Sequence, residues 1–228
     1  RVPAAARPAW DLSMSRALET PDDARALGRK RWRVRRTVPI EDTAMRWQLE
    51  YPQAYWSLIV PEAARWGLSP FFVDGIMRQE SRYRRGVVSW ADAMGLIQLI
   101  PSTAARVGQL VGFEVPRFRV FEPAVNLRLG TAYLGLLFRE FGGVYVLTAA
   151  AYNSGAPAIK GFLGRKNQGI DEAVEDIAYN EGRNYCRKVL GHLLVYLTLH
   201  ASVEERKALL PNLVPDSVPR TFPGVIDF

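Results

Sequence analysis

Residues 70–80 show a pattern of apolar positions that is typical of one face of an α-helix. Glu80 continues this apolar stripe, because it follows Ile76 by four residues. The pattern therefore predicts a helix that is packed on one side and carries a carboxyl group at the end of its buried face. The apolar positions of the stripe are Phe72, Val73, Ile76 and Met77.

A carboxyl group on an apolar helix face is costly to ionise. Desolvation disfavours the charged form, so the pKa rises and the group holds a proton at neutral pH. Such a group can protonate a leaving group, which makes Glu80 the candidate general acid of this chain. This segment alone leaves one alternative open, a small rotation of the helix that brings Glu80 to solvent or to a salt bridge.

Other helical patterns follow along the chain, and the clearest covers residues 124–141. Val125 and Leu129 lie on its apolar face, and Gly142 and Gly143 end the pattern. No alternating strand pattern and no internal repeat is present, so the sequence predicts an all-α fold. The other predicted helices cover residues 44–60, 101–111, 144–153, 157–163, 171–179 and 181–201, with a loop over 82–96.

Three regions of the chain differ in composition. Residues 1–43 are rich in Ala and Arg and predict a helical N-terminal segment. Residues 44–201 hold the amphipathic patterns and predict one folded domain, which suits a chain of 228 residues with 48% hydrophobic composition. Residues 202–228 predict an extended C-terminal tail. The prolines of this tail are Pro211, Pro215, Pro219 and Pro223.

The charge balance points to an anionic partner. The net charge is +7 and the pI is near 9.7, which suits an anionic cell-wall polymer or a nucleic acid. Residues 29–36 are strongly basic and form either a binding patch or a solvated helix face. No apolar run reaches the ~20 residues that cross a bilayer. The sequence begins with Arg1 rather than an initiator Met and shows no basic-then-apolar secretion signal, so we expect a processed or trimmed piece of a longer protein.

Four short blocks in a fixed order carry most of the chemical information. The four blocks are Glu80 with Ser81, residues 95–104 around Gln98, residues 149–155 with Tyr152 and Asn153, and Glu175 with Tyr185. In this order they resemble the catalytic domain of soluble lytic transglycosylases, whose pattern is a Glu-Ser pair, a Gly-Leu-Met-Gln-x-x-Pro-x-Thr-Ala run, an Ala-Tyr-Asn-Ala-Gly run and a late Glu followed by a Tyr. Residues 51–55 also resemble the segment that enters this domain in larger members, and the resemblance covers residues 50–200.

The resemblance implies an all-α, lysozyme-like catalytic domain of the goose type over residues 44–201, with the helical N-terminal segment and the extended tail as additions. It implies cleavage of the β-1,4 bond between N-acetylmuramic acid and N-acetylglucosamine in peptidoglycan, without hydrolysis. Glu80 then acts first as acid and later as base. The N-acetyl group of the substrate stabilises the cation, and its 6-hydroxyl attacks to leave a 1,6-anhydro-muramyl end. A periplasmic or cell-envelope location follows from the same resemblance.

Four polar or aromatic side chains are expected around this acid. Ser89 is expected to hydrogen-bond Glu80 and orient it. Gln98 offers two donors and an acceptor for a sugar hydroxyl or acetamido group, or else caps the helix that follows. Tyr152 offers a flat apolar face with a polar tip, unless it is a core aromatic, and Asn153 can bond an acetamide.

Two late residues complete the expected site. Glu175 and Tyr185 match family positions that line the same site, although Glu175 taken alone is also consistent with an exposed helix residue. We expect no metal and no organic cofactor, because His192, His200 and the single cysteine, Cys186, do not furnish a family-typical metal site. Peptidoglycan strands are the expected partner, and nucleic acid is not expected.

Departures from the family pattern concern the segment before Gln98. Asp92 stands where Gly is usual, Met94 where a small polar residue is common, and Ile97 where Met is usual. Asp is among the better non-glycine residues for a positive φ, so Asp92 is expected in a turn. These changes leave the acid in place and affect the expected substrate specificity.

Two other functions remain open at this point. A hydrolytic muramidase of related fold would need a carboxylate that activates water, and the candidates are Asp92 and Glu175. The other alternative is a catalytically inactive module that binds the cell wall. A nucleic-acid binder has only the positive charge in its favour.

Overall fold

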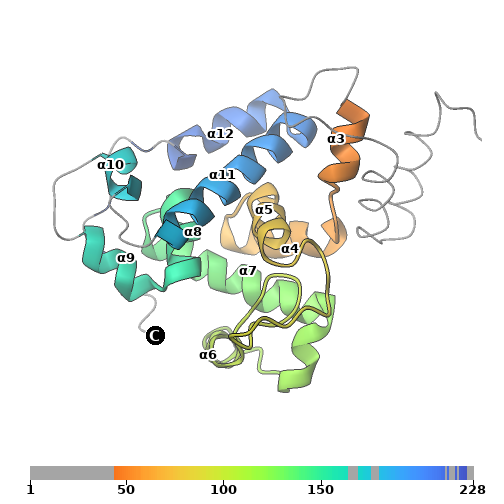
Figure 1. The fold of residues 1–228 in the computed structure, drawn as a ribbon. Coiled ribbons are helices and arrows are strands. Elements are labelled where there is room, and N and C mark those ends of the chain that lie inside the picture. The colour runs from red at the N-terminus through yellow and green to blue at the C-terminus, as the bar shows by residue number, and fades with distance from the viewer. Residues whose placement is uncertain are drawn as a thin grey trace, which may run out of the picture.

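A computed structural model describes residues 44–163, 169–175 and 180–213, together with 215, 219 and 221–224. In this part of the chain the regular elements are helices, as Figure 1 shows, and extended pairing is limited to isolated bridges between Val88 and Met94 and between Met94 and Leu99. The all-α prediction is confirmed. The helical segment predicted over residues 1–43 lies outside the described residues.

The structure divides the helix predicted over residues 44–60 into α3 (Ala44–Glu50) and α4 (Trp56–Trp66). The break has a local cause. Pro52 has no amide hydrogen with which to continue α3, and Tyr55 has a left-handed backbone with a φ of 54°. The prediction of a single helix is therefore wrong at residues 51–55.

The remaining helices follow the predicted order. Three of them, α5, α6 and α7, begin with a proline, which loses nothing there because amide hydrogens in the first turn of a helix have no partner within it. The helices are α5 (Pro70–Glu80), α6 (Pro101–Leu110), the 3-10 helix η3 (Arg117–Phe121), α7 (Pro123–Glu140), α8 (Tyr145–Ser154), α9 (Ala156–Leu163), α10 (Ile170–Glu175) and α11 (Asn180–His200).

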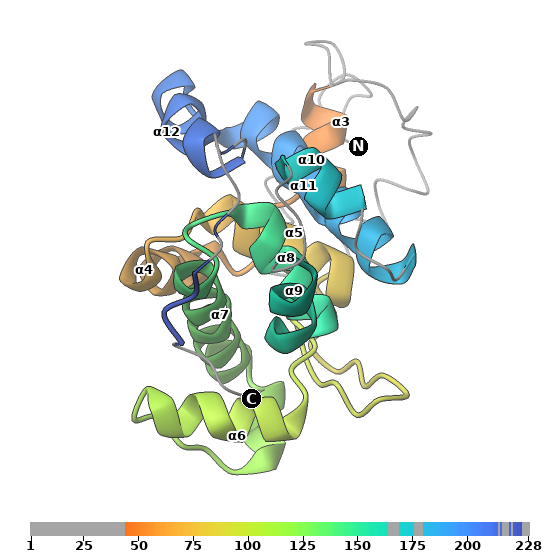
Figure 2. The ribbon, with the colours of Figure 1, turned by 90° about the vertical axis from the view of Figure 1, so that its left-hand side faces the viewer.

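Helix α5 packs against α11, and this pair positions the candidate acid. The two helices approach closely at Gly75, where an added Cβ would lie 3.5 Å from the backbone of both Val189 and Leu193. Helix α4 packs against α7, and α8 contacts both α7 and α11. Figure 2 shows the loop between α5 and α6 projecting away from these helices.

Helices α7 and α8 contribute much of the buried core. Gly142 and Gly143 turn the chain between them with φ values of 62° and 79°, as the sequence predicted. Among the described helices, none alone combines the length and the apolar composition that a membrane crossing needs. Only α7 and α8 taken together do so, and they are bent by 119°.

The C-terminal region differs from the prediction of an extended tail. Residues Val203–Leu213 form helix α12, with Pro211 inside it. The helix starts with a reciprocal pair in which Glu205 N donates to Ser202 Oγ at 3.1 Å and Ser202 N donates to Glu205 Oε2 at 2.7 Å. Prolines alone suggested extended chain, and this capping signal outweighs them. The prediction of an extended tail is therefore wrong for residues 203–213.

Candidate active site

Glu80 lies at the last position of α5, where the buried face of the helix reaches the surface. The helix buries every residue from Phe71 to Met77, and Glu80 itself is half-buried. Burial raises the pKa of Glu80 from 4.5 to about 7, and a hydrogen bond from Tyr185 offsets part of that rise. Both protonation states are therefore accessible near neutral pH, as the helical pattern predicted.

Tyr185 of α11 is the side chain that holds Glu80. Its hydroxyl donates to Glu80 Oε1, and its ring is buried. Burial raises the pKa of the Tyr185 phenol well above its usual value, and the nearby Glu80 carboxyl raises it further. The hydroxyl therefore stays protonated and remains a donor to the carboxyl group, which favours the ionised form of Glu80 after a proton has left.

Ser89 contacts its own loop in this structure. Its Oγ accepts hydrogen bonds from Ala91 N at 3.2 Å and Ala93 N at 3.0 Å, which fixes a tight turn. Ser89 was expected to donate a hydrogen bond to Glu80. In the structure the hydrogen bond to Glu80 comes from the Tyr185 hydroxyl instead. Serine hydroxyls often bond to nearby backbone in this way, and sequence spacing does not separate this use from a catalytic one.

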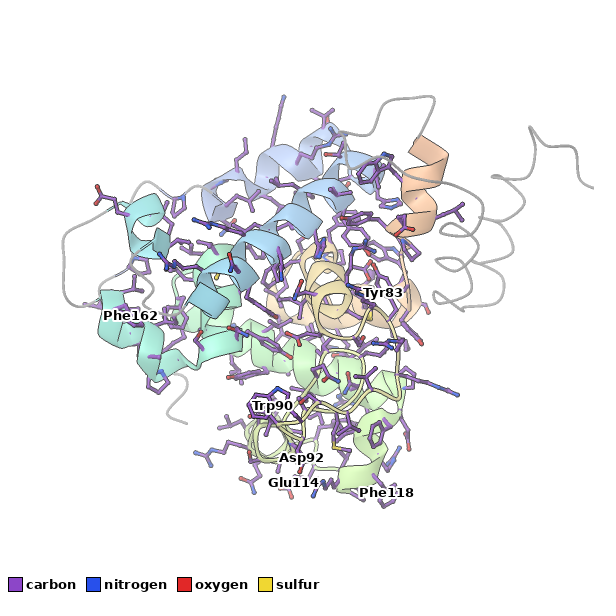
Figure 3. All side chains as sticks on the ribbon, viewed as in Figure 1. Tyr83, Trp90, Asp92, Glu114, Phe118 and Phe162 are labelled. Carbon is purple, nitrogen blue, oxygen red and sulfur yellow. The ribbon has the colours of Figure 1, made fainter. Side chains whose placement is uncertain are left out.

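Asp92 occupies the same turn with a φ of 63°, as expected for a residue that replaces glycine. Its Oδ2 accepts from Arg117 Nη2 at 3.0 Å, and both side chains are exposed. In Figure 3 Asp92 and Trp90 lie toward α6 and far from Tyr83, which lies close to α5. Asp92 thus has a structural role in the turn.

Gln98 closes a second turn, residues 94–99, which we call the Met94–Leu99 turn. Met94 and Leu99 exchange both backbone hydrogen bonds, at 2.9 and 3.0 Å. Gln98 has a positive φ of 50°, and its Nε2 donates to Val87 O at 3.1 Å and to Gly95 O at 2.9 Å. The amide nitrogen therefore holds the loop, and the amide oxygen has no hydrogen-bond donor among the described residues.

Tyr152 connects this turn to the candidate acid. Its hydroxyl donates to Ile97 O at 2.5 Å, and its ring lies against Tyr133 with 5.4 Å between centroids. Burial raises the pKa of Tyr152 well above its usual value, and the charge of Glu80 raises it further. The ring is half-buried, so Tyr152 both packs in the core and borders the site.

The other predicted site residues lie at helix ends. Asn153 is exposed in the last turn of α8, where Ser154 Oγ donates to its Oδ1 at 3.4 Å. Glu175 is the last residue of α10, and its side chain lies outside the described residues. The structure therefore brings Tyr185 and Tyr152 to Glu80 and leaves the role of Glu175 a prediction.

Asn126 is a buried amide that sequence analysis did not identify as part of the site. Its Oδ1 accepts from Ile97 N at 3.0 Å, and its Nδ2 donates to Met94 O and Val120 O, each at 3.0 Å. The available signal was an asparagine within the apolar pattern of α7. A buried amide needs partners, and two of these partners, Met94 and Ile97, are far from Asn126 in sequence.

A second polar cluster, also missed, lies where α5 meets α3 and α11. The guanidinium of Arg78 lies 3.8 Å from the centroid of the Tyr51 ring, and its Nη1 donates to Glu50 O. We call this group the Arg78 cluster. Its members are Glu50, Tyr51, Asp74, Arg78, Tyr83 and Tyr196, with Tyr83 and Tyr196 joined through their hydroxyls.

The histidine, cysteine and acidic side chains of the described residues bear on metal binding and nucleophilic chemistry. Within the described residues, no group of three or more His, Cys, Asp and Glu side chains is placed to hold a metal ion. Cys186 is buried, and its thiol lies 3.8 Å from Val146 O. Burial raises the pKa of this thiol to about 12, so it stays protonated and unreactive at neutral pH.

Comparison with known proteins gives a consistent result. The chain is 32% identical over 152 residues to the soluble lytic murein transglycosylase of Salmonella typhimurium, covering 64% of this chain and 23% of that protein. It is 35% identical over 158 residues to the membrane-bound lytic murein transglycosylase C of Actinobacillus pleuropneumoniae, covering 59% of this chain and 43% of that protein. The chain thus spans less than half the length of these relatives.

Solved structures agree with the sequence relatives. An inactive mutant of the lytic transglycosylase Slt from Pseudomonas aeruginosa has a TM-score of 0.67 at 27% identity, covering 84% of this chain and 30% of that one. The 70 kDa soluble lytic transglycosylase of Escherichia coli has a TM-score of 0.66 at 25% identity, covering 77% and 28%. The family model described as the transglycosylase SLT domain matches residues 57–174, and the chain therefore belongs to this family.

Proposed function

We propose that this chain is a peptidoglycan lytic transglycosylase that cleaves the β-1,4 bond between N-acetylmuramic acid and N-acetylglucosamine. The observation that carries the proposal is a single half-buried carboxyl group, Glu80, whose pKa is raised to about 7 and which receives a hydrogen bond from Tyr185. Family membership and the named activity of the relatives support the same assignment.

The first step of the proposed reaction is proton transfer. Protonated Glu80 gives its proton to the glycosidic oxygen, the bond between that oxygen and the anomeric carbon breaks, and the bonding electrons leave with the oxygen. The N-acetyl group of the N-acetylmuramic acid residue stabilises the positive anomeric carbon. Glu80 is then an anion, and the Tyr185 hydroxyl stabilises it.

The second step returns the enzyme to its starting state. The 6-hydroxyl of the same sugar attacks the anomeric carbon and loses its proton to the Glu80 carboxylate. The products are a 1,6-anhydro-muramyl end and a new N-acetylglucosamine end, and no water is consumed. One carboxyl group with a pKa near neutrality serves both steps, which is why a raised but moderate pKa suits the reaction.

Substrate contacts are proposed for the residues around the acid. The free amide oxygen of Gln98 is an acceptor for a hydroxyl or amide hydrogen of the sugar. Exposed Asn153 has both a donor and an acceptor for an acetamido group. Tyr152 borders the site with its ring, and Glu175 is proposed to act in binding rather than in proton transfer.

The proposed partner is the glycan strand of peptidoglycan, and the proposed location is the cell envelope, in the periplasm. The net charge of +7 favours an anionic polymer. The names of the relatives refer to murein, which favours the cell-wall polymer over nucleic acid. The domain division at residues 44–201 belongs to the same proposal.

A hydrolytic muramidase is the competing function, and it needs a second carboxylate. An inverting hydrolase holds water with a carboxylate roughly 6.5–9.5 Å from the acid. Asp92 is a candidate by sequence, but its Oδ2 is engaged by Arg117 in an exposed turn. That contact favours the lytic reaction, in which no such carboxylate is needed.

Mass spectrometry of digested, purified peptidoglycan tests the proposal. We expect 1,6-anhydro ends from the unmodified chain and from Asp92→Gly, because glycine tolerates the positive φ at that position. Glu175→Gln is expected to weaken activity without changing the product. Reducing ends, lost together with activity in Asp92→Asn, would reassign the chain as a hydrolase. No cleavage by the unmodified chain would leave a wall-binding module.

A further inference from the structure

The turn that carries Gln98 is attached to α7 through one side chain, Asn126. Asn126 is fully buried, and each of its three hydrogen bonds is 3.0 Å long. Two of them reach the Met94–Leu99 turn, at Met94 O and Ile97 N, and the third reaches Val120 O within η3. The oxygen and both hydrogens of one amide group are therefore used to join three segments.

The atoms around the Asn126 side-chain amide are closely packed. A Cβ added at Gly95 would lie 2.4 Å from Asn126 Nδ2, so the turn approaches the amide as closely as backbone allows. One helical turn further along α7, a Cβ at Gly130 would collide with the side chain of Ile97. Glycine at these two positions lets the turn lie directly on α7.

The turn holds a backbone conformation that needs such support. Gln98 has a φ of 50°, which side-chain-bearing residues adopt at a cost. The surrounding contacts must offset that cost. Asn126 supplies two buried side-chain hydrogen bonds to the turn. The backbone hydrogen bonds between Met94 and Leu99, the Gln98 amide nitrogen and the Tyr152 hydroxyl add to this support.

The same turn also reaches the candidate acid. Ile97 uses its amide hydrogen for Asn126 and its carbonyl oxygen for the Tyr152 hydroxyl, so one peptide segment links the two side chains. Tyr152 lies close enough to Glu80 for the charge of Glu80 to influence it. A shift of the turn therefore moves both the Gln98 amide oxygen and the Tyr152 ring relative to Glu80.

We propose that Asn126 is a positioning residue for the reaction, which fixes the Met94–Leu99 turn and through it Gln98 and Tyr152. Asn126 does not touch the substrate. The inference rests on the proposed function for its effect on turnover, but the attachment of the turn to α7 is a separate property that can be measured without substrate.

Three variants separate positioning from stability. Asn126→Leu removes all three hydrogen bonds at similar size. Asn126→Asp keeps an acceptor for Ile97 N, and when protonated it keeps one donor. Thr131→Val is the matched control, because Thr131 is buried in the same helix and its Oγ1 has no hydrogen-bond partner among the described residues. Each variant is measured for kcat and KM on soluble peptidoglycan fragments, for amide hydrogen exchange and for thermal unfolding.

We expect kcat to fall about a hundred-fold in Asn126→Leu and about ten-fold in Asn126→Asp, because each unsatisfied buried group adds to the cost. KM should change less than kcat, and Thr131→Val should stay within about two-fold. The Ile97 amide should exchange faster in Asn126→Leu than in Asn126→Asp, at temperatures where both variants are folded.

Either of two results for folded Asn126→Asp overturns the proposal. One is a kcat equal to that of the unmodified chain. The other is a reduced kcat with unchanged amide hydrogen exchange at Met94, Ile97 and Leu99. If Asn126→Leu does not fold, Asn126→Asp alone decides between these outcomes. If the unmodified chain cleaves no peptidoglycan, the proposed function fails. Hydrogen exchange at the turn still decides whether Asn126 holds it.

Discussion

Helix α5 carries two sheltered carboxyl groups with different surroundings, Asp74 and Glu80. Burial raises the pKa of both, well above 3.8 for Asp74 and from 4.5 to about 7 for Glu80. Asp74 is fully buried, and neither of its oxygens has a hydrogen-bond partner among the described residues. Glu80 is half-buried and receives a hydrogen bond from Tyr185. A raised pKa is thus shared by a core residue and a candidate acid.

Access distinguishes the two carboxyl groups. A general acid must lie within hydrogen-bond reach of the proton acceptor on the substrate. Asp74 lies within the Arg78 cluster inside the protein, where the positive charge of Arg78 partly counters the effect of burial on its pKa. Glu80 lies at the end of its helix and is partly exposed. A raised pKa therefore identifies a candidate catalytic residue only together with access to substrate.

The largest expected effect is on Glu80 itself. We expect Glu80→Gln to lower turnover of purified peptidoglycan roughly 10³-fold, because glutamine keeps the shape but has no proton of suitable acidity to give. Thermal unfolding should show an intact fold. Retention of more than a few per cent of activity would contradict the role of Glu80 as the acid.

Tyr185→Phe should have the next largest effect. Loss of a hydrogen bond to a charged group should lower kcat by roughly ten-fold. The bond from Tyr185 lowers the pKa of Glu80, so its removal raises that pKa. In the unmodified chain activity should fall as pH rises through about 7, and in Tyr185→Phe that fall should occur at higher pH. If the pH at which activity falls is the same in Tyr185→Phe as in the unmodified chain, the hydrogen bond from Tyr185 does not set the pKa of Glu80.

The raised pKa values of Asp74 and Glu80 should both affect how the free energy of unfolding changes with pH. Between pH 4.5 and about 7, Glu80 holds its proton in the folded state and loses it in the unfolded state. The free energy of unfolding therefore falls as pH rises through this window, by at most about 1.4 kcal/mol per unit for one proton. Above about pH 7 the contribution is constant.

Glu80→Gln removes this contribution. The stability of Glu80→Gln relative to the unmodified chain should therefore increase between pH 4.5 and about 7 and then level off. Urea unfolding at a series of pH values measures the difference. A difference that is constant with pH would mean that Glu80 titrates alike in the folded and unfolded states.

The smallest expected effect on activity comes from the other carboxyl group. Asp74→Asn should leave kcat within about two-fold, since Asp74 makes no contact that strengthens in the transition state. It should nevertheless alter the pH dependence of stability in the same direction as Glu80→Gln, because burial raises the pKa of Asp74 as well. A large loss of kcat in folded Asp74→Asn would remove the distinction drawn between the two groups.

Sequence patterns predicted helices well where one apolar face packs on one neighbour. The stripe ending at Glu80 correctly indicated both the helix and a half-buried carboxyl group with a raised pKa, whereas the role of Glu80 as the acid stays a prediction. Errors arose where a local contact overrides composition. Pro52 and the left-handed Tyr55 interrupt a helical pattern, and the reciprocal bonds of Ser202 and Glu205 begin a helix in a proline-rich region.

Side-chain partners were harder to predict than helices. Ser89 was expected to bond Glu80, but its Oγ accepts from two backbone amides of its own turn. Tyr185 was predicted to line the site, and its contact with Glu80 depends on the packing of α5 on α11. Asn126 bonds to Met94, which is distant in sequence, so spacing within α7 does not reveal this contact. The charge that acts on Asp74 belongs to Arg78 in the same helix, but the burial that raises the pKa of Asp74 depends on how the helices pack.

The Arg78 cluster determines where a shortened version of this protein can begin. The family match starts at residue 57, but the carbonyl of Tyr51 accepts from His200 Nε2 at 2.9 Å and that of Pro52 accepts from Tyr196 at 3.1 Å. A fragment cut at the match boundary would leave the guanidinium of Arg78 without Glu50 and Tyr51. An expression fragment should therefore include α3 in full and start no later than Ala44.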